Sequence, residues 1–223
     1  MLEPLLQLFF PHLCACCGIS LHWHEQSCCY SCLKQLPFTD FFDIPNNQVE
    51  HLFTGRITVT AASLLYFESK YTQPMLHLFK YKKRKSIGVL IGQLIAESIN
   101  NSKRFQSIDL IIPVPLHPRK EKIRGYNQSW IIAKTIGQQL NIQAKNNLLV
   151  RNTFTDTQTK KDRLNRWKNV DNKFSTTKDE QLSGKHVLLI DDVVTTGATA
   201  EACLQTLKNV NCQSLYFVSA ASA

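Results

Sequence analysis

The sequence of 223 residues has no apolar run as long as a membrane-spanning helix requires, so we expect a protein that is not inserted in a bilayer. The apolar segment 2–13 has no basic region before it, contains Pro4 and Pro11 and leads directly into cysteines, which argues against a secretion signal. We therefore expect a cytoplasmic protein. Internal repeats and low-complexity tracts are also absent, and the length suits one main domain with a small satellite.

Acidic residues are outnumbered by basic ones, 17 against 26, which gives a formal net charge of +9. Such a balance favours polyanionic partners, among them pyrophosphate, nucleotides and nucleic acid. Charge alone does not choose among these partners, and solvated lysine-rich faces would produce the same balance.

Apolar residues follow two kinds of spacing along the chain. Strand-like segments occupy residues 58–67, 109–114, 186–190 and 215–220. Helical spacing occupies residues 73–82, 86–100, 127–140 and 198–210. This alternation predicts an α/β fold with a parallel sheet, in which ligands bind at the carboxyl ends of strands.

Turn-forming residues divide the chain in two. Residues 41–56 contain Pro45, Asn46 and Asn47 and are predicted to form a linker. The predicted units are an N-terminal helix with a cysteine ribbon at 1–40 and the α/β domain at 57–223.

Two adjacent acids follow the apolar strand segment 186–190. Asp191 and Asp192, at the tip of a strand, can accept hydrogen bonds from two vicinal hydroxyl groups, one for each carboxylate. The next turn offers backbone N–H groups, hydroxyls and a glycine that permits a positive φ, which suits a monophosphate. Its residues are Thr195, Thr196, Gly197, Ala198 and Thr199.

The acids and the turn together predict a site for a sugar with free 2- and 3-hydroxyls and a 5-phosphate. The alternative is a turn that merely caps the following helix through Thr195 or Thr196. Capping would explain the threonines but not two acids in the same turn.

Six of the eight cysteines lie between Cys14 and Cys32 and include two Cys-x-x-Cys knuckles, Cys14/Cys17 and Cys29/Cys32, separated by eleven residues. This spacing predicts four thiolates around a structural Zn²⁺ ion that stabilises a small ribbon and performs no chemistry. A disulfide cluster is not expected without a secretion signal. Other ligands remain open, namely Cys16, Cys28, His12, His22 and His24.

Two polar segments complete the set of candidates. Three prolines between 113 and 118 predict a stiff, extended loop, and Asn127 can cap the helix that follows. Residues 155–170 are polar and basic with few apolar anchors, which is typical of a mobile lid over an anionic ligand. A solvated basic loop would have the same composition in both cases.

The acidic turn resembles the phosphoribosyl-pyrophosphate (PRPP) loop of type I phosphoribosyltransferases. Nearly the whole chain resembles the ComF family of competence-associated proteins, which join an N-terminal four-cysteine ribbon to a phosphoribosyltransferase domain. The marks of this resemblance are Cys14-x-x-Cys17-Gly18, Cys29-x-x-Cys32, Lys80-Tyr81-Lys82, Pro113-Val114-Pro115-Leu116, Arg124-Gly125-Tyr126-Asn127-Gln128, Thr157-Gln158 with Arg166 and Asn169-Val170, and the acidic turn. Lys83 departs from the pattern, because the family often has glycine at that position.

The resemblance implies a type I phosphoribosyltransferase fold and roles for individual residues. Asp191 and Asp192 would hold the ribose hydroxyls, the threonine turn would hold the 5-phosphate, and Mg²⁺ would bridge pyrophosphate and ribose. Candidates for the pyrophosphate loop are Pro115, Leu116, His117, Arg119 and Arg124, and candidates for the lid are Lys160, Lys161, Arg163 and Arg166. The four-cysteine metal set is Cys14, Cys17, Cys29 and Cys32.

The leading hypothesis is a Mg²⁺-dependent, PRPP-binding transferase in which Asp191 or Asp192 stabilises the sugar cation as pyrophosphate leaves. The resemblance links it to the uptake of transforming DNA and to competence-machinery proteins, and supplies no acceptor. One alternative is a non-catalytic module that binds single-stranded DNA weakly through basic loops and aromatic residues. Another is a PRPP sensor without turnover. The intact acids favour the first hypothesis, since carboxylates do not help to bind a polyanion.

Overall fold

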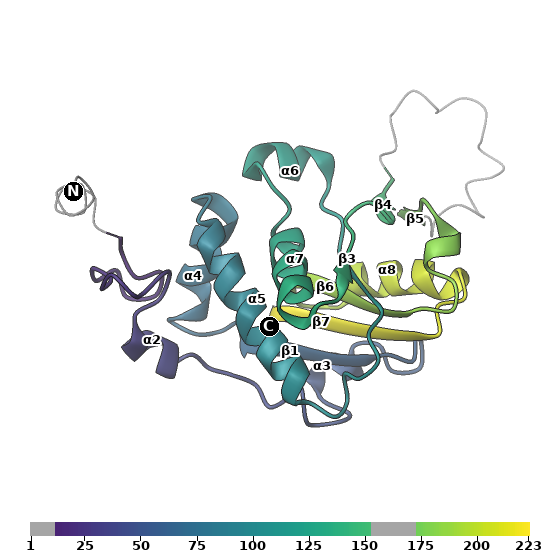
Figure 1. Ribbon diagram of the computed structural model, residues 1–223, viewed down its shortest axis with the longest axis horizontal. Coiled ribbons are helices and arrows are strands. Elements are labelled where there is room, and N and C mark those ends of the chain that lie inside the picture. Colours follow the sequence, from purple (N-terminus) through teal and green to yellow (C-terminus); the bar gives the residue numbers. More distant parts are fainter. Residues whose placement is uncertain (1–11, 153–172) are drawn as a thin grey trace.

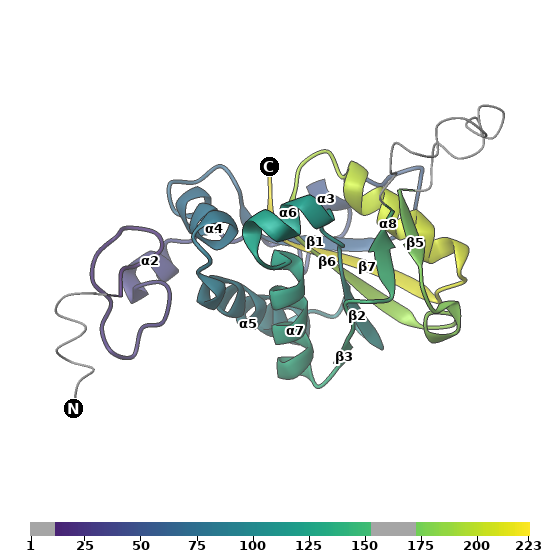
Figure 2. The same ribbon diagram turned by 90° about the horizontal axis from the view of Figure 1, so that it is seen from above.

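The computed structural model describes residues 12–152 and 173–223 (Figures 1 and 2). The predicted lid therefore lies outside the described residues. The described chain contains a parallel sheet of five strands in the order β1-β7-β6-β2-β3, as the alternation of segments predicted. The strands are β1 (Thr60–Tyr66), β2 (Leu110–Pro113), β3 (Gln143–Ala144), β6 (His186–Val194) and β7 (Ser214–Ser222).

Helices cover both faces of this sheet, which explains the continuous buried apolar run from Val187 to Ile190 in the central strand β6. Helices α4 (Thr72–Tyr81), α5 (Lys85–Asn101) and α7 (Gln128–Leu140) connect β1 to β2 and β2 to β3, whereas α8 (Ala198–Asn209) connects β6 to β7. These two sets of connections run in opposite directions across the sheet. Right-handed crossovers therefore place α8 on the opposite face of the sheet from α5 and α7, as Figure 2 shows.

The strand order reverses between β2 and β6, which are neighbours in the sheet. The chain leaves β2 toward β3 and leaves β6 toward β7, so the two following loops diverge and open a crevice at the carboxyl edge. β2 ends at Pro113 opposite Ile190, but β6 continues beside β7 as far as the pair Val194 and Ser222. The strand is thus longer than the predicted 186–190, and both acids lie within it.

The proline-rich segment after β2 differs from the prediction. Residues Pro118–Arg124 form helix α6, so the expected extended loop is limited to the residues before it. Pro118 occupies the start of the helix, where its missing N–H is not needed. The predicted cap is confirmed: the Asn127 side chain accepts a hydrogen bond from the Ser129 N–H at 3.0 Å, at the start of α7.

Residues 41–56 are not a linker. They contain helix α3 (Gln48–His51), and the side chains of Phe41, Phe42, Val49 and Phe53 are buried in the same core as the sheet. Asn47 caps α3 and donates from Nδ2 to the Ala61 carbonyl of β1 at 2.8 Å. The turn-forming residues at 45–47 were read correctly as a turn. The buried apolar side chains on either side nevertheless pack the segment against the sheet.

Two shorter elements complete the described fold. Strands β4 (Leu149–Arg151) and β5 (Phe174–Thr176) form a two-stranded antiparallel sheet, and Asp179–Gln181 form a 3₁₀ turn. Helix α2 (Tyr30–Lys34) belongs to the cysteine-containing N-terminal segment. None of the described helices is both long and apolar enough to cross a membrane.

Candidate functional site

The two acids on β6 have different partners. Asp191 Oδ1 accepts hydrogen bonds from the Ser129 hydroxyl at 3.1 Å and from the Asp192 N–H at 2.8 Å. Asp192 Oδ2 lies 3.2 Å from Lys80 Nζ and 3.7 Å from Arg124 Nη1. A neutral hydroxyl therefore faces the first acid, while two cations compensate the second.

Burial, and after it the neighbouring charge of Asp192, raise the pKa of Asp191 to about 7. Hydrogen bonds from the Asp192 N–H and from Ser129 oppose this rise, as does the charge of Lys80. The Asp191 carboxyl therefore exchanges its proton near neutral pH, unlike an ordinary aspartate.

The turn after β6 forms a small concave cradle. Gly197 has a φ of +74° and is the N-cap of α8, without a side-chain capping bond from either threonine. The interpretation as a simple threonine cap is therefore wrong. The cradle has a volume of about 60 Å³ and is lined by Asp191 and residues 193–200. A Cβ on Gly197 would lie 3.0 Å from Leu52 Cβ, so residues of the misassigned linker support this turn.

A larger cavity of about 240 Å³ shares Asp191, Val193 and Thr199 with the cradle. Four basic side chains line it, namely Lys80, Lys120, Arg124 and Arg151. Of the predicted pyrophosphate-loop residues, Pro115, Leu116 and Arg124 line the cavity. His117 and Arg119 do not line it; His117 Nδ1 instead accepts the Arg119 N–H at 3.2 Å as the cap of α6. The lid candidates Lys160, Lys161, Arg163 and Arg166 lie outside the described residues.

Sequence reasoning missed several residues of this cavity. Lys80 comes from the end of α4, Ser129 from the start of α7 and Arg151 from the end of β4. The Lys80-Tyr81-Lys82 motif was a signal for the first of these. No local pattern distinguishes Ser129 or Arg151 from ordinary surface residues.

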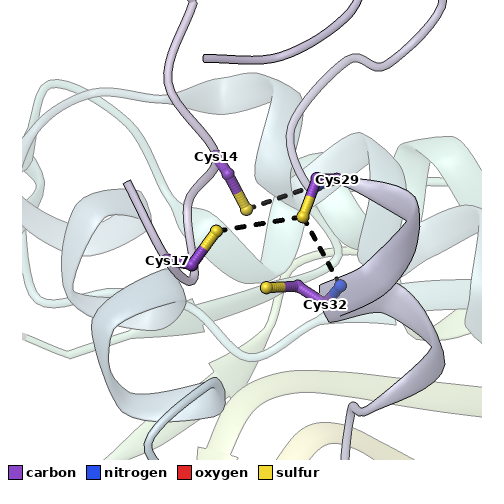
Figure 3. A group of neighbouring side chains, drawn as sticks. All are labelled: Cys14, Cys17, Cys29 and Cys32. Atoms are coloured by element: carbon purple, nitrogen blue, oxygen red, sulfur yellow. Dashed lines mark hydrogen bonds between the residues drawn. The ribbon is translucent and has the colours of Figure 1, made fainter. Parts of the chain in front are cut away.

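Figure 3 shows the four cysteines of the predicted metal set pointing toward one another. The Sγ atoms of Cys14, Cys17, Cys29 and Cys32 all lie within 4.8 Å of one another. Burial raises the pKa of Cys14, but backbone N–H groups of Cys17, Cys29 and Cys16 lower it more, to about 6. A four-thiolate donor set in this arrangement fits a tetrahedral Zn²⁺ ion.

A second group of cysteines shares Cys14 with the first. The Sγ atoms of Cys14, Cys16 and Cys28 also lie within 4.8 Å of one another. Cys16 Sγ is 3.2 Å from Cys28 Sγ, which is 4.0 Å from Cys14 Sγ. The three histidines named as alternative ligands, His12, His22 and His24, belong to neither group.

Comparison with known proteins gives the class of the domain and then the family. Residues 129–222 match the family model described as phosphoribosyl transferase domain, and together with the parallel sheet they define a phosphoribosyltransferase-type fold. The chain is 29% identical over 210 residues to Competence protein F of Haemophilus influenzae, covering 92% of this chain and 82% of that protein. It is 31% identical over 137 residues to the DNA utilization protein YhgH of Escherichia coli, covering 60% of each. Together with the four-cysteine cluster, these similarities support a ComF-family protein.

Solved structures resemble the chain more distantly. The glutamine PRPP amidotransferase from B. subtilis has a TM-score of 0.45 and 17% identity, over 61% of this chain and 26% of that one. An adenine phosphoribosyltransferase from Leishmania donovani has a TM-score of 0.39 and 15% identity, over 65% of this chain and 68% of that one.

The raised pKa of Asp191 predicts a pH-dependent effect of Asp191→Asn on stability. Between about pH 4 and pH 7 the unfolded chain has lost this proton while the folded chain retains it, so stability falls as pH rises through this window. We expect Asp191→Asn to raise the free energy of unfolding by roughly 1–3 kcal/mol at pH 8 and by much less at pH 5.

Urea unfolding at both pH values measures this difference. The matched control is Asp43→Asn, because Asp43 is exposed and does not line the cavity. An equal effect of Asp191→Asn at pH 5 and pH 8 would contradict the raised pKa.

The cysteine geometry predicts one Zn²⁺ per chain held by the four-cysteine set. Cys17→Ser or Cys29→Ser should reduce the bound zinc strongly, because three thiolates leave the tetrahedral set incomplete. Cys16→Ser and Cys28→Ser are the matched controls and should retain it. Elemental analysis of the purified variants decides the ligand set; the reverse pattern would assign the metal to the group that contains Cys16 and Cys28.

Proposed function

We propose that the protein binds PRPP together with Mg²⁺ and transfers its ribose 5-phosphate unit to an acceptor. The observation that carries the proposal is the meeting of three features at one sheet edge: a pair of carboxylates, a concave turn with a left-handed glycine, and four cations around one cavity. Each feature matches one part of PRPP, namely its vicinal hydroxyls, its 5-phosphate and its pyrophosphate.

In this proposal Asp191 and Asp192 accept hydrogen bonds from the two ribose hydroxyls. The backbone N–H groups and hydroxyls at residues 195–199 bind the 5-phosphate at the start of α8. The four cations of the cavity bind the pyrophosphate. Mg²⁺, when bound, adds positive charge that neutralises the pyrophosphate oxygens.

The ion pairs of Asp192 give binding an exchange step. Lys80 and Arg124 lie beside its carboxylate and also line the cavity. When pyrophosphate enters, these cations gain new anionic partners, and the carboxylate becomes available to the ribose. The same charges then stabilise the transfer: the bond from the anomeric carbon to pyrophosphate breaks, the carboxylates stabilise the sugar cation, and the acceptor bonds to that carbon.

The biological setting is part of the proposal. The names Competence protein F and DNA utilization protein, borne by relatives, support a role in competence and DNA utilization. We further propose competence-machinery proteins as partners. The eight free cysteines suit a cytoplasmic location, where thiols stay reduced.

PRPP with Mg²⁺ is expected to raise the thermal unfolding temperature of the protein, because a ligand that binds only the folded state stabilises it. The double substitution Asp191→Asn with Asp192→Asn should abolish binding measured by calorimetry. Asp40→Asn with Asp43→Asn provides an exposed control of equal charge change. Unchanged PRPP affinity in the first double variant would remove these acids from the site.

Release of pyrophosphate then distinguishes a transferase from a sensor. A screen of bases, amines and oligonucleotides that yields pyrophosphate with one class identifies the acceptor. If PRPP binds but no acceptor causes release of pyrophosphate, the protein is better described as a PRPP sensor without turnover.

A second candidate, weak binding of single-stranded DNA, is supported by a basic surface beside the cavity. Lys83 has a φ of +55°, which turns the chain between α4 and α5 so that its side chain lies 3.6 Å from the Cβ position of Gly125 at the end of α6. The turn and α6 together carry exposed cations, namely Lys82, Lys83, Lys85, Arg119, Lys120 and Lys122.

Binding of single-stranded DNA should weaken as salt rises, because such contacts release counterions from phosphates. Replacing Lys82, Lys83 and Lys85 by glutamine should reduce the slope of log K against log salt by about 2, since each phosphate contact contributes about 0.7. Fluorescence anisotropy with two unrelated oligonucleotides at several salt concentrations measures this slope. Lys173→Gln and Lys178→Gln serve as exposed controls. Strong sequence preference that survives high salt would contradict an electrostatic mode.

A further inference from the structure

Helix α4 delivers Lys80 to the cavity. Lys80 lies in the last turn of α4, with its Nζ atom 3.2 Å from Asp192 Oδ2. The helix packs on the core through Met75, Leu76 and Phe79, all at most 1% exposed. The position of Lys80 therefore depends on how α4 as a whole is held.

The cysteine ribbon, residues 12–36, contacts the chain at both ends of α4. At the start, the Tyr71 hydroxyl donates to Gln35 Oε1 at 2.6 Å. Just after the end, Arg84 Nη2 donates to the Leu13 carbonyl at 2.8 Å. Figures 1 and 2 both show α2 of the ribbon beside α4.

These two contacts come from different knuckles of the metal set. Leu13 directly precedes Cys14, and Gln35 directly follows α2, which contains Cys32. Tyr71 and Leu90 also pack against the cysteine cluster itself. The metal-binding cysteines are thus connected to both ends of α4 through very few residues.

We propose that the metal-bound ribbon positions Lys80 in the anion site by holding α4 at both ends. The metal fixes the two knuckles relative to each other, and the contacts of Gln35 and Leu13 pass that constraint to the helix. This inference rests on the proposed function for the identity of the anion, PRPP. Since coupling between two sites is reciprocal, the bound anion also strengthens retention of the metal.

The effect is graded because α4 has other anchors. Its apolar face remains packed, and the Tyr126 hydroxyl donates to the Phe79 carbonyl. Loss of one ribbon contact therefore shifts Lys80 without removing it. We expect Tyr71→Phe and Gln35→Leu each to weaken PRPP binding about threefold to tenfold, the usual effect of one hydrogen bond.

Calorimetry with PRPP and Mg²⁺ and elemental analysis of zinc, both on the full chain, test the proposal. Tyr71→Phe and Gln35→Leu should keep full zinc and lose affinity, whereas Tyr30→Phe, at an exposed tyrosine of the ribbon, should keep both. In a Lys80→Met background the same two substitutions should cause no further loss of affinity. An equal loss with and without Lys80 would overturn the proposal, because it would mean that the ribbon acts on the site by another route.

Hydrogen exchange without any ligand separates this inference from the proposed function. Removal of zinc with a chelator should increase exchange in residues 72–81 more than in α7, which the ribbon contacts do not include. Such an increase supports the positioning role even if the wild-type protein fails to bind PRPP, in which case the proposed function is wrong. Unchanged exchange in α4 overturns the positioning role and leaves the proposed function standing.

Discussion

The site depends on the point where β2 stops pairing with β6. β2 ends opposite Ile190, and the next two residues of β6 are the acids. Because β7 continues to pair with β6 beyond that point, the backbone that carries the acids stays rigid on one side and opens to the crevice on the other. The cradle, the cavity and the converging cations all follow from this difference in strand length.

This arrangement brings unfavourable electrostatic interactions to the strand end. Two adjacent carboxylates repel each other, and burial disfavours the charge of Asp191 in particular. Lys80 and Arg124 offset the charge of Asp192, while Ser129 offers Asp191 only a hydrogen bond. Adjacent buried carboxylates with nearby cations lower the stability of the folded state. Such clusters are typical of binding sites, where the same groups recognise a ligand.

The N-terminal part of the chain supports this site from two directions. Leu52 and Phe53 lie beside Gly197 in the concave turn after β6, and the ribbon contacts both ends of α4. The predicted boundary between an appendage at 1–40 and a domain at 57–223 is thus crossed by contacts that reach both halves of the site.

The backbone at Lys83 explains one departure from the family pattern. Its left-handed backbone conformation favours glycine, which accounts for the residue that the family often has there.

The sequence by itself determined the elements whose signals are local. Apolar periodicity predicted strands β1, β2, β6 and β7 and helices α4, α5, α7 and α8, and Cys-x-x-Cys spacing predicted the four-cysteine cluster. The order of acids, threonines and glycine predicted a turn between strand and helix after Asp192. Only the tertiary structure decided which distant residues meet there. Lys80, Ser129 and Arg151 reach one cavity because of the strand order and crossovers, which no local pattern specifies. The same holds for residues 41–56, where turn-forming residues suggested a linker but buried aromatic side chains, which gain free energy only against the assembled sheet, keep the segment in the core.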